Sequence, residues 1–228
     1  IIDNGVKEVM DIRNIQIAID GPAASGKSTV ATIVANKLGY THIDTGSMYR
    51  AITLVALEQE IDINDESNFG FVKDLTFAFI DDRLHMNGRD VSKDIRKHNV
   101  SNNVSLVSSY ITIRRECVKF QRLIAERENT VMDGRDIGTV VLPDADFKFF
   151  LVASIEKRAQ RRYEDNLKRG IESNIGIIKE KIAERDHFDS NRKHSPLRPA
   201  DDAFIIDTSD LTIEQVVALI TKRIRGNV

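Results

Sequence analysis

Residues 21 to 29 of the sequence, GPAASGKST, have the types and spacing of a loop that binds phosphate. They match the pattern G-x-x-x-x-G-K-[ST], whose glycines let backbone N–H groups turn toward phosphate oxygens. In such a loop Lys27 contacts the β- and γ-phosphates of a nucleotide, and the Ser28 hydroxyl binds Mg²⁺. The predicted nucleotide-binding residues are Gly21, Pro22, Ala23, Ala24, Ser25, Gly26, Lys27, Ser28 and Thr29.

The segments on either side of this loop have the patterns that a phosphate-binding loop requires. Residues 15 to 20 form a short, mostly apolar run that ends in a turn signal, which is typical of a buried strand. Residues 27 to 38 carry apolar side chains at helical spacing, and Gly39 follows as a common helix-ending residue. The start of that helix would direct unpaired N–H groups and a positive dipole end at the phosphates.

Arginines and aspartates after other predicted strands indicate a second anion site. An acceptor phosphate is already ionised at neutral pH, because its second pKa is about 6, so a kinase acting on it needs no general base. Such an enzyme must instead bring two polyanions together, and arginine supplies bidentate, permanently charged donors for that purpose. Arg50 follows one predicted strand and the stretch DGRD at 133–136 follows another, at the sheet edge where α/β proteins bind ligands.

Asp133, the last residue of the apolar run TVMD, has two open interpretations. An acidic side chain at this position could orient water on Mg²⁺. It could equally cap the loop that follows the strand.

Two later segments carry arginines at helical spacing. An Arg–Asp pair four residues apart on a helix is commonly a solvated ion pair worth a few tenths of a kcal/mol, and a row of arginines is commonly a wet helix face. The phosphate loop favours an anion site over these structural interpretations, since like charges on one helix repel unless an anion separates them. The residues are Arg158, Arg161 and Arg162 in the first segment, and Arg185, Asp189 and Arg192, expected on one helix face, in the second.

A guanine-nucleotide switch is excluded by the absence of its motifs. No glycine in the chain has an aspartate three residues before it, so the D-x-x-G pattern is missing. The string NKLG at 36–39 lies in the helix that leaves the phosphate loop and cannot face a base.

The elements that must position these residues alternate between strand and helix, which predicts a parallel α/β sheet flanked by helices. Residues 60 to 100 interrupt the alternation. There Asn87-Gly88, a dipeptide typical of type I′ hairpin turns, separates two short runs and indicates a small inserted antiparallel element. Helical patterning returns from about 99 through 128. Thr212 and Gln215 fit a capping box at the start of a terminal helix.

Composition limits the classes of partner. With 33 basic and 35 acidic residues the formal charge is −2, which argues against a dedicated nucleic-acid binder. The single cysteine, Cys117, allows no internal disulfide, which fits a cytoplasmic setting. We expect Cys117 to be a buried or half-buried residue of a helix. No apolar run reaches the roughly 18 residues of a membrane span. A monomer without membrane or nucleic-acid partners is expected.

Beyond these motifs, the chain closely resembles the bacterial cytidylate kinase family of nucleoside monophosphate kinases. The resemblance covers about residues 15 to 225. It is carried by DTGSMYR, DGRDIGTVVLPDAD, RRYEDNLKRGIESN and RDHFDSNRKHSPLRPADDA, and by the inserted segment with MNGRDVS. It implies the P-loop kinase fold, with ATP and CMP or dCMP as substrates and Mg²⁺ as cofactor.

The resemblance also implies roles for individual residues. The helix at 158–169 would be a lid over ATP. We expect Lys27, Arg135, Arg158 and Arg162 to be the catalytic residues. Ser28 is expected at the metal, together with Asp133 if its role is to orient water on Mg²⁺. The acceptor residues would be Arg50 and Arg135 on the phosphate with Thr45 nearby, Ser105, Arg114, Asp136 and Arg192 around cytosine, and Arg185 and Asp189 at the sugar hydroxyls.

The domain division that follows has four parts. Residues 1–14 would be an N-terminal extension, and 15–45, 114–153 and 175–228 the P-loop core. Residues 46–113 would bind the nucleoside monophosphate, and 154–174 would be the lid. Two alternatives remain: a P-loop kinase for UMP, AMP or another small metabolite, and a P-loop protein that binds nucleotide without transferring phosphate.

Overall fold

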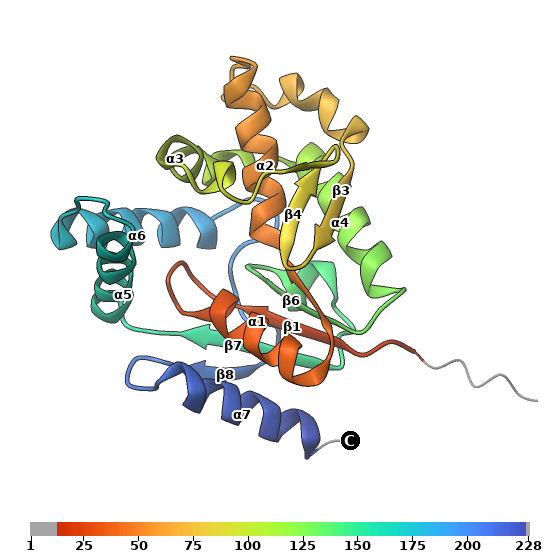
Figure 1. The fold of residues 1–228 in the computed structure, drawn as a ribbon, viewed down its shortest axis with the longest axis vertical. Coiled ribbons are helices and arrows are strands. Elements are labelled where there is room, and N and C mark those ends of the chain that lie inside the picture. The colour runs from red at the N-terminus through yellow and green to blue at the C-terminus, as the bar shows by residue number, and fades with distance from the viewer. Residues whose placement is uncertain (1–12, 227–228) are drawn as a thin grey trace, which may run out of the picture.

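Five parallel strands form the central sheet of the computed structural model, which describes residues 13–226. Their order is β2-β6-β1-β7-β8, so the strand that precedes the phosphate loop lies in the middle (Figure 1). Because the neighbouring strands are parallel, their carboxyl ends meet at one edge, where the predicted site residues follow. The strands are β1 Gln16–Asp20, β2 Thr41–Asp44, β6 Thr130–Gly134, β7 Phe147–Val152 and β8 Phe204–Asp207.

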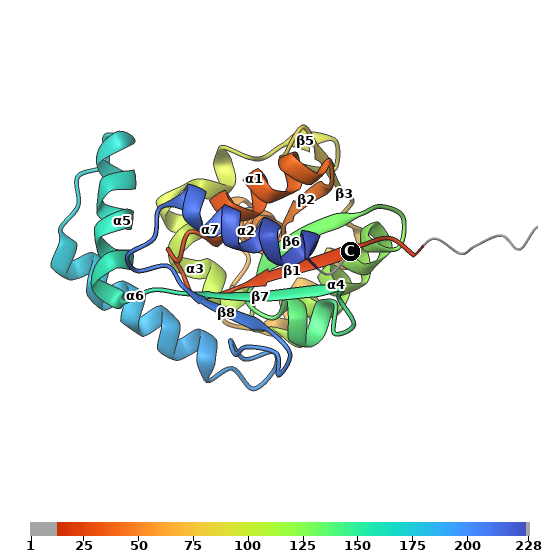
Figure 2. The same ribbon diagram turned by 90° about the horizontal axis from the view of Figure 1, so that it is seen from below.

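Helices cover both faces of this sheet (Figure 2). On one face, α1 (Lys27–Leu38) and α7 (Ile213–Arg225) pack against β1, β7 and β8 through buried aliphatic side chains. On the other, α4 (Ile111–Ala125) and a π-helical turn, Ile137–Val141, enclose a second apolar cluster. The predicted P-loop kinase fold is confirmed. The predicted extension at 1–14 lies outside the described residues, except for its last two.

The inserted segment builds its own apolar core above the sheet. Helix α2 (Thr45–Glu58) is buried along most of its length and packs against a three-stranded antiparallel sheet and α3 (His98–Val107). The predicted Asn87-Gly88 turn is present, with both residues at positive φ. The remaining elements are η1 Glu66–Asp74, β3 Phe77–Ile80, β4 Arg83–Met86, β5 Arg89–Asp90 and η2 Asp94–Arg96.

A second tight turn, Asp81-Asp82, joins β3 to β4 and was not predicted. Both aspartates adopt positive φ, of 50° and 58°. Aspartate tolerates this left-handed region better than most residues, since its short side chain can bond locally, but Asp-Asp is a weaker turn signal than Asn-Gly.

The helical stretch predicted from 99 through 128 is divided into α3 and α4. The break falls at Ser108 to Tyr110, where backbone N–H groups bond back to the last turn of α3. The predicted helical patterning is confirmed, but the break itself was not predicted, because apolar spacing continues across it. The interruption brings Ser108 to the site described below. Cys117 is buried in α4, as expected.

Two charged helices, α5 (Ile155–Lys168) and α6 (Ile175–Ser190), project together from the carboxyl edge of the sheet (Figures 1 and 2). Ser154 caps the first and Asn174 the second. Arg192 was expected on one face of a helix with Arg185 and Asp189, but α6 ends at Ser190, so Arg192 approaches from the following loop. Within residues 13–226, no helix is long and apolar enough to cross a bilayer.

Candidate functional site

The phosphate loop runs from the end of β1 to the start of α1 and is closely packed. Gly21 has φ +154°, and a Cβ there would lie 2.3 Å from the carbonyl oxygen of Leu151, so only glycine fits. Gly26, at φ 90°, leads into the free N–H groups of α1. The geometry fits an anion held by backbone N–H groups at a helix N-terminus.

Lys27 is nearly enclosed, with 7% of its surface exposed. Its Nζ donates to the carbonyl oxygen of Pro22 at 3.2 Å, which uses one of its three donors. Burial, followed by the positive charge of Arg135, lowers the pKa of Lys27 to about 7. A bound anion would oppose both effects, because a nearby negative charge raises the pKa of Lys27.

Ser28, Asp133, His42 and Thr32 form a closed cycle of hydrogen bonds beside the loop. Ser28 Oγ donates to Asp133 Oδ2 at 2.5 Å, and Asp133 Oδ1 lies 2.9 Å from His42 Nε2. On the other side of the imidazole, Nδ1 lies 3.2 Å from Thr32 Oγ1, which donates to the carbonyl oxygen of Ser28 at 2.9 Å. The cycle therefore begins and ends on Ser28.

The hydrogen bonds of this cycle and the charges around it both favour the doubly protonated form of His42. Thr32 has one hydroxyl proton, which goes to Ser28, so both imidazole nitrogens must donate for every contact to be satisfied. Burial disfavours the charged ring, but the hydrogen bond and charge of Asp133 outweigh burial and raise the pKa of His42. Burial of Asp133 is likewise outweighed by His42 and Lys27, and the pKa of Asp133 is lowered.

Thr45 joins β2 to β6 behind the cycle. Its hydroxyl donates to the backbone carbonyl oxygen of Asp133 at 2.7 Å, and its side chain is buried. Gly134 leaves the room for this contact, since a Cβ there would lie 2.7 Å from Thr45 Oγ1 and 2.6 Å from Ile137 Cδ1. Thr45 was expected near the acceptor phosphate. The structure places it directly after β2, against the backbone of Asp133 near the end of the neighbouring strand β6.

Asp20 connects the phosphate loop to the π-helical turn. Its carboxylate accepts from the backbone N–H groups of Ile137 and Gly138, each at 2.8 Å. Burial raises the pKa of Asp20 to about 7, although the two N–H donors act in the opposite direction. The contact ties the stretch 133–136 to the end of β1.

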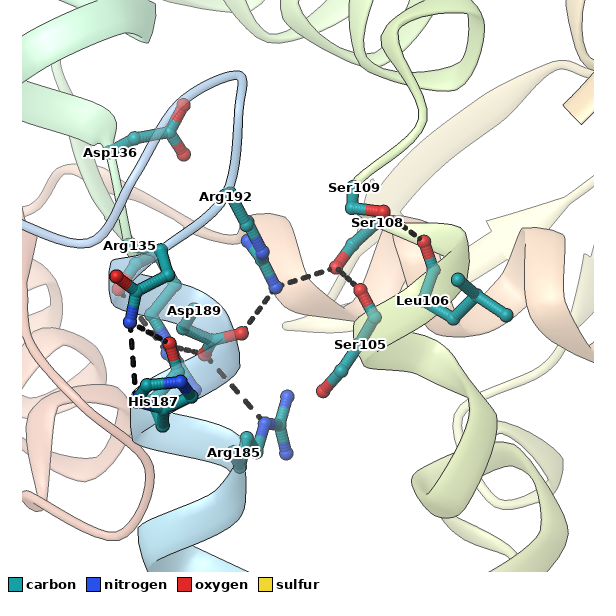
Figure 3. A network of polar contacts seen from close by, with 12 residues as sticks. Ser105, Leu106, Ser108, Ser109, Arg135, Asp136, Arg185, His187, Asp189 and Arg192 are labelled. Atoms are coloured by element: carbon teal, nitrogen blue, oxygen red, sulfur yellow. Dashed lines mark hydrogen bonds and ion pairs between the residues drawn. The ribbon is translucent and has the colours of Figure 1, made fainter.

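Asp189 is the centre of an arginine cluster in the cleft between α6 and the sheet edge (Figure 3). Arg135 Nε donates to Asp189 Oδ2 at 3.0 Å, and Arg192 bonds Oδ1. Arg185 Nε lies 3.8 Å from Oδ2, beyond hydrogen-bond range. Three arginines thus share one carboxylate, which leaves positive charge in surplus.

A second buried pair, Asp136 with Arg114, lies next to this cluster. The two side chains are 6% and 3% exposed, and Arg114 also donates to the carbonyl oxygen of Ser108 at 3.1 Å. Arg192 donates to the Ser108 hydroxyl at 3.0 Å and so links the two pairs (Figure 3). Tyr49 packs under Arg114, with its ring centroid 5.4 Å from the guanidinium carbon.

Ser105 and Arg50 line the side of this cleft that the inserted segment contributes. The Ser105 hydroxyl makes no protein hydrogen bond within the described residues, and Figure 3 shows its side chain directed toward the arginines. Arg50 donates to Ser101 at 2.9 Å, and burial lowers its pKa to about 10. Burial and the charge of Arg135 lower the pKa of Arg185 to about 9. Closely spaced, desolvated cations of this kind are a site for a polyanion.

The base of α5 contacts the phosphate loop directly. Arg158, which is 6% exposed, donates to the carbonyl oxygen of Ala23 at 3.2 Å and pairs with Asp186 at 2.6 Å. Arg161 donates to Thr208 and, at 3.4 Å, to the carbonyl oxygen of Ser25. The spacing grouped the three arginines of α5 on one helix face, but their contacts differ: of the three, only Arg162 makes no hydrogen bond or ion pair to the described residues.

Several residues of this site were not identified from the sequence, among them Asp20, His42, Ser108 and Asp186. Asp20 directly precedes the loop, and a carboxylate at the end of a buried strand was an available signal for it. His42 alternates with Asp44 on β2, but only strand pairing brings it to Asp133. Ser108 and Asp186 had no local signal, because each acts through a partner that is distant in sequence.

Comparison with known proteins agrees with this geometry. The model of a family described as Cytidylate kinase matches residues 17–226. The chain is 49% identical to the cytidylate kinase of Acholeplasma laidlawii (strain PG-8A) over 211 residues, which cover 92% of this chain and 95% of that protein. It is 50% identical to the cytidylate kinase of Bacillus cereus (strain ATCC 10987 / NRS 248) over 219 residues, 94% and 97% of the two chains.

A solved structure also shares the fold. The crystal structure of an uncharacterized protein from Eubacterium ventriosum ATCC 27560 has a TM-score of 0.50 to this chain at 15% identity. The match covers 93% of this chain and 99% of that one. At this identity the likeness concerns the fold alone.

Proposed function

This chain belongs to the cytidylate kinase family, and we propose that its cleft transfers the γ-phosphate of ATP directly to CMP or dCMP, giving ADP and CDP or dCDP. The enzyme is a phosphotransferase whose acceptor is itself a phosphate group. The donor would lie on the phosphate loop and the acceptor in the cleft between the sheet edge, the inserted segment and α6.

The observation that carries this proposal is the polar cleft beside the loop, in which cations exceed their carboxylate partners. Three arginines contact Asp189, while Arg50 has a hydroxyl as its protein partner. Two nucleotides bring several negative charges to the edge of one sheet, and these cations would balance them. A P-loop protein that only binds nucleotide has no need for this second cluster.

The base of the acceptor would lie against Asp136, Arg114 and Ser105. Cytosine offers one amino donor and acceptors on its Watson–Crick edge, for which a carboxylate together with guanidinium and hydroxyl donors is the complementary set. Uracil replaces the amino donor with a carbonyl oxygen, which would face the carboxylate of Asp136. Such a mispaired group costs about 1–3 kcal/mol, so we expect UMP to be a poor substrate.

Transfer needs no general base in this arrangement. An oxygen of the acceptor phosphate attacks the γ-phosphorus, the bond to the β–γ bridging oxygen breaks, and ADP leaves. Arg50 and Arg135 would hold the acceptor phosphate, while Lys27, Arg158 and Arg162 would balance the charge that spreads over the transferred group. Closure of α5 and α6 would exclude water and so suppress hydrolysis of ATP.

The residues beside the loop fit Mg²⁺. Ser28 and Asp133 offer a hydroxyl and a carboxylate, the hard oxygen donors that this ion prefers. Within residues 13–226 no three His, Cys, Asp or Glu side chains form a metal cage, which agrees with Mg²⁺ held mainly by phosphates and water. When bound, the ion would supply positive charge that offsets the charge developing on the phosphates. Asp133 would act on it through water or through Ser28.

The test is ADP formation from Mg·ATP with CMP, dCMP, UMP, AMP and GMP as separate acceptors. We expect strong turnover with CMP and dCMP and at least ten-fold lower kcat/KM with UMP. Equal turnover with UMP or AMP would support a kinase of other specificity. Nucleotide binding without acceptor-dependent ADP would support the non-catalytic alternative.

A further inference from the structure

His42 lies on β2 beside the phosphate loop, and the closed cycle of hydrogen bonds fixes its position. Asp133 has two carboxylate oxygens, and each makes one side-chain contact: Oδ2 with Ser28 and Oδ1 with His42. Asp133 is 1% exposed and His42 9% exposed, so water does not replace these contacts in the folded chain. The orientation of the carboxylate is thus set from one side by the loop and from the other by the imidazole.

The imidazole itself is held at both ends. Nε2 lies 2.9 Å from Asp133, and Nδ1 lies 3.2 Å from the hydroxyl of Thr32, one turn along α1 from Ser28. Thr32 donates to the carbonyl oxygen of Ser28. Because the contacts return to Ser28, a rotation of the Thr32, His42 or Asp133 side chain breaks two hydrogen bonds.

The cycle also decides what Ser28 can offer a metal. Its hydroxyl proton is directed at Asp133, so the lone pairs of Oγ are free to accept a cation. Without His42 the Asp133 carboxylate could turn toward the ammonium of Lys27, whose positive charge helps to lower the pKa of Asp133. That turn would release the Ser28 proton and withdraw Lys27 from the phosphates.

We propose that His42 is a positioning residue for the magnesium site: its Nε2 holds the Asp133 carboxylate, and through it the Ser28 hydroxyl, in the orientation that binds Mg·nucleotide. The inference rests on the proposed function, since it assumes that this loop binds a metal–nucleotide complex. Groups that orient metal ligands typically change metal affinity about 10- to 100-fold when removed.

A cavity borders the same side of the cycle and makes substitution at this position feasible. It has a volume of about 370 Å³ and is lined by Ser28, Thr32, His42 and Asp44 and by residues of the inserted segment. A smaller polar side chain at position 42 would therefore border open space, which water can fill.

Two amide substitutions at His42 distinguish the contact made by Nε2 from the contact made by Nδ1. In His42→Gln the side-chain nitrogen lies near the position of Nε2 and can still donate to Asp133. In His42→Asn it lies near the position of Nδ1, so the contact to Thr32 can remain while that to Asp133 is lost. Both variants are polar and uncharged, and they differ mainly in the contact that the proposal requires.

The experiment is calorimetric titration of the whole chain with ADP, once with MgCl₂ and once with EDTA, for wild type and both variants. The readout is the ratio of the two affinities, with the melting temperature of the ligand-free protein measured alongside. We expect His42→Asn to lower this ratio about ten-fold or more, and His42→Gln to keep it within about three-fold of wild type.

An unchanged ratio in His42→Asn would overturn the proposal, as would an equal fall in both variants. A parallel loss of ADP affinity with EDTA, which leaves the ratio unchanged, would mark His42 as a structural support of the loop and also overturn it. Acceptor-dependent turnover by wild type tests the proposed function separately, because it does not depend on these variants.

Discussion

At the scale of single residues, we propose that Asp136 discriminates cytosine from uracil. It is buried, and its protein partner is Arg114. We predict that Asp136→Ala raises the KM for CMP and narrows the CMP-to-UMP ratio of kcat/KM by about one to two decades, because uracil no longer meets a carboxylate. Steady-state kinetics with both acceptors measure this ratio, and the affinity for ADP should hold within a few-fold.

The alanine variant leaves Arg114 buried without its partner, and breaking such a pair costs about 3–5 kcal/mol. Asp136→Asn, which keeps the shape and one acceptor, provides a second test if the alanine variant does not fold. Loss of ADP affinity with an unchanged CMP-to-UMP ratio in either variant would place Asp136 in the donor site and contradict the assignment.

The pKa of Asp20 predicts a pH dependence of stability opposite in sign to that of a carboxylate whose pKa is lowered, such as Asp189. Burial raises its pKa from 3.8 to about 7 in the folded chain. Between these values the native state holds a proton that the unfolded state has released, so stability from this group is present at low pH and falls as pH rises. The slope is at most about 1.4 kcal/mol per pH unit.

We therefore predict that wild type loses stability relative to Asp20→Asn as pH rises from 4.5 to 6.5. Denaturant unfolding of both proteins at about three pH values in this window measures the difference, in which the other titrating groups cancel. A difference that does not vary with pH would mean that the N–H groups of Ile137 and Gly138 keep Asp20 ionised.

At the scale of elements, α5 separates a structural arginine from one available to the substrate. Arg161 ties the helix to Thr208 and to the phosphate loop. Arg162, the next residue, has no such protein partner among residues 13–226, and burial, followed by the charge of Arg169, lowers its pKa. The two positions form a matched pair on one helix.

We predict that substitution by methionine mainly lowers thermal stability at position 161 and mainly lowers kcat at position 162. Arg161→Met should cost about 1–3 kcal/mol, on the order of 5 °C in Tm, and raise the KM for ATP. Arg162→Met should leave Tm within about 2 °C and lower kcat about ten-fold or more, because it removes charge that balances the transferred phosphate. Thermal unfolding and steady-state kinetics check both, and equal Tm losses would show that the helix uses the two arginines alike.

At the scale of the whole molecule, charge is distributed unevenly. The chain has a formal charge of −2, while the cleft holds more cations than carboxylates. We expect this surplus of positive charge to attract substrate phosphates through an electric field that salt screens, with a Debye length of about 10 Å at 0.1 M.

We predict that raising NaCl from about 50 to about 500 mM increases the KM for CMP several-fold, with a smaller change in kcat. Inhibition by cytidine, which lacks the phosphate, is the control and should depend little on salt. An equal salt dependence for cytidine would locate the effect in the protein conformation, outside the phosphate contacts.

Local patterns were sufficient to predict much of this molecule. The phosphate loop, the strands around it, the Asn87-Gly88 turn and the capping box at Thr212 all depend on residues within a few positions of one another. Their physical causes are equally local: glycine at positive φ, a helix start, and side chains that bond neighbouring backbone groups. Arg135 and Asp136 were proposed for the site because they directly follow β6, and Arg50 because it lies near the start of the helix that follows β2.

What the sequence by itself determined was therefore the chemistry available: a nucleotide loop, a parallel α/β sheet, and arginines for a second anion. The tertiary structure decided which groups meet. His42 reaches Asp133 because β2 pairs with β6, and Arg192 reaches Ser108 because one helix ends and another breaks. Strand order and helix ends depend on packing across the whole chain. A periodic pattern along one segment does not indicate which distant segment will pack against it.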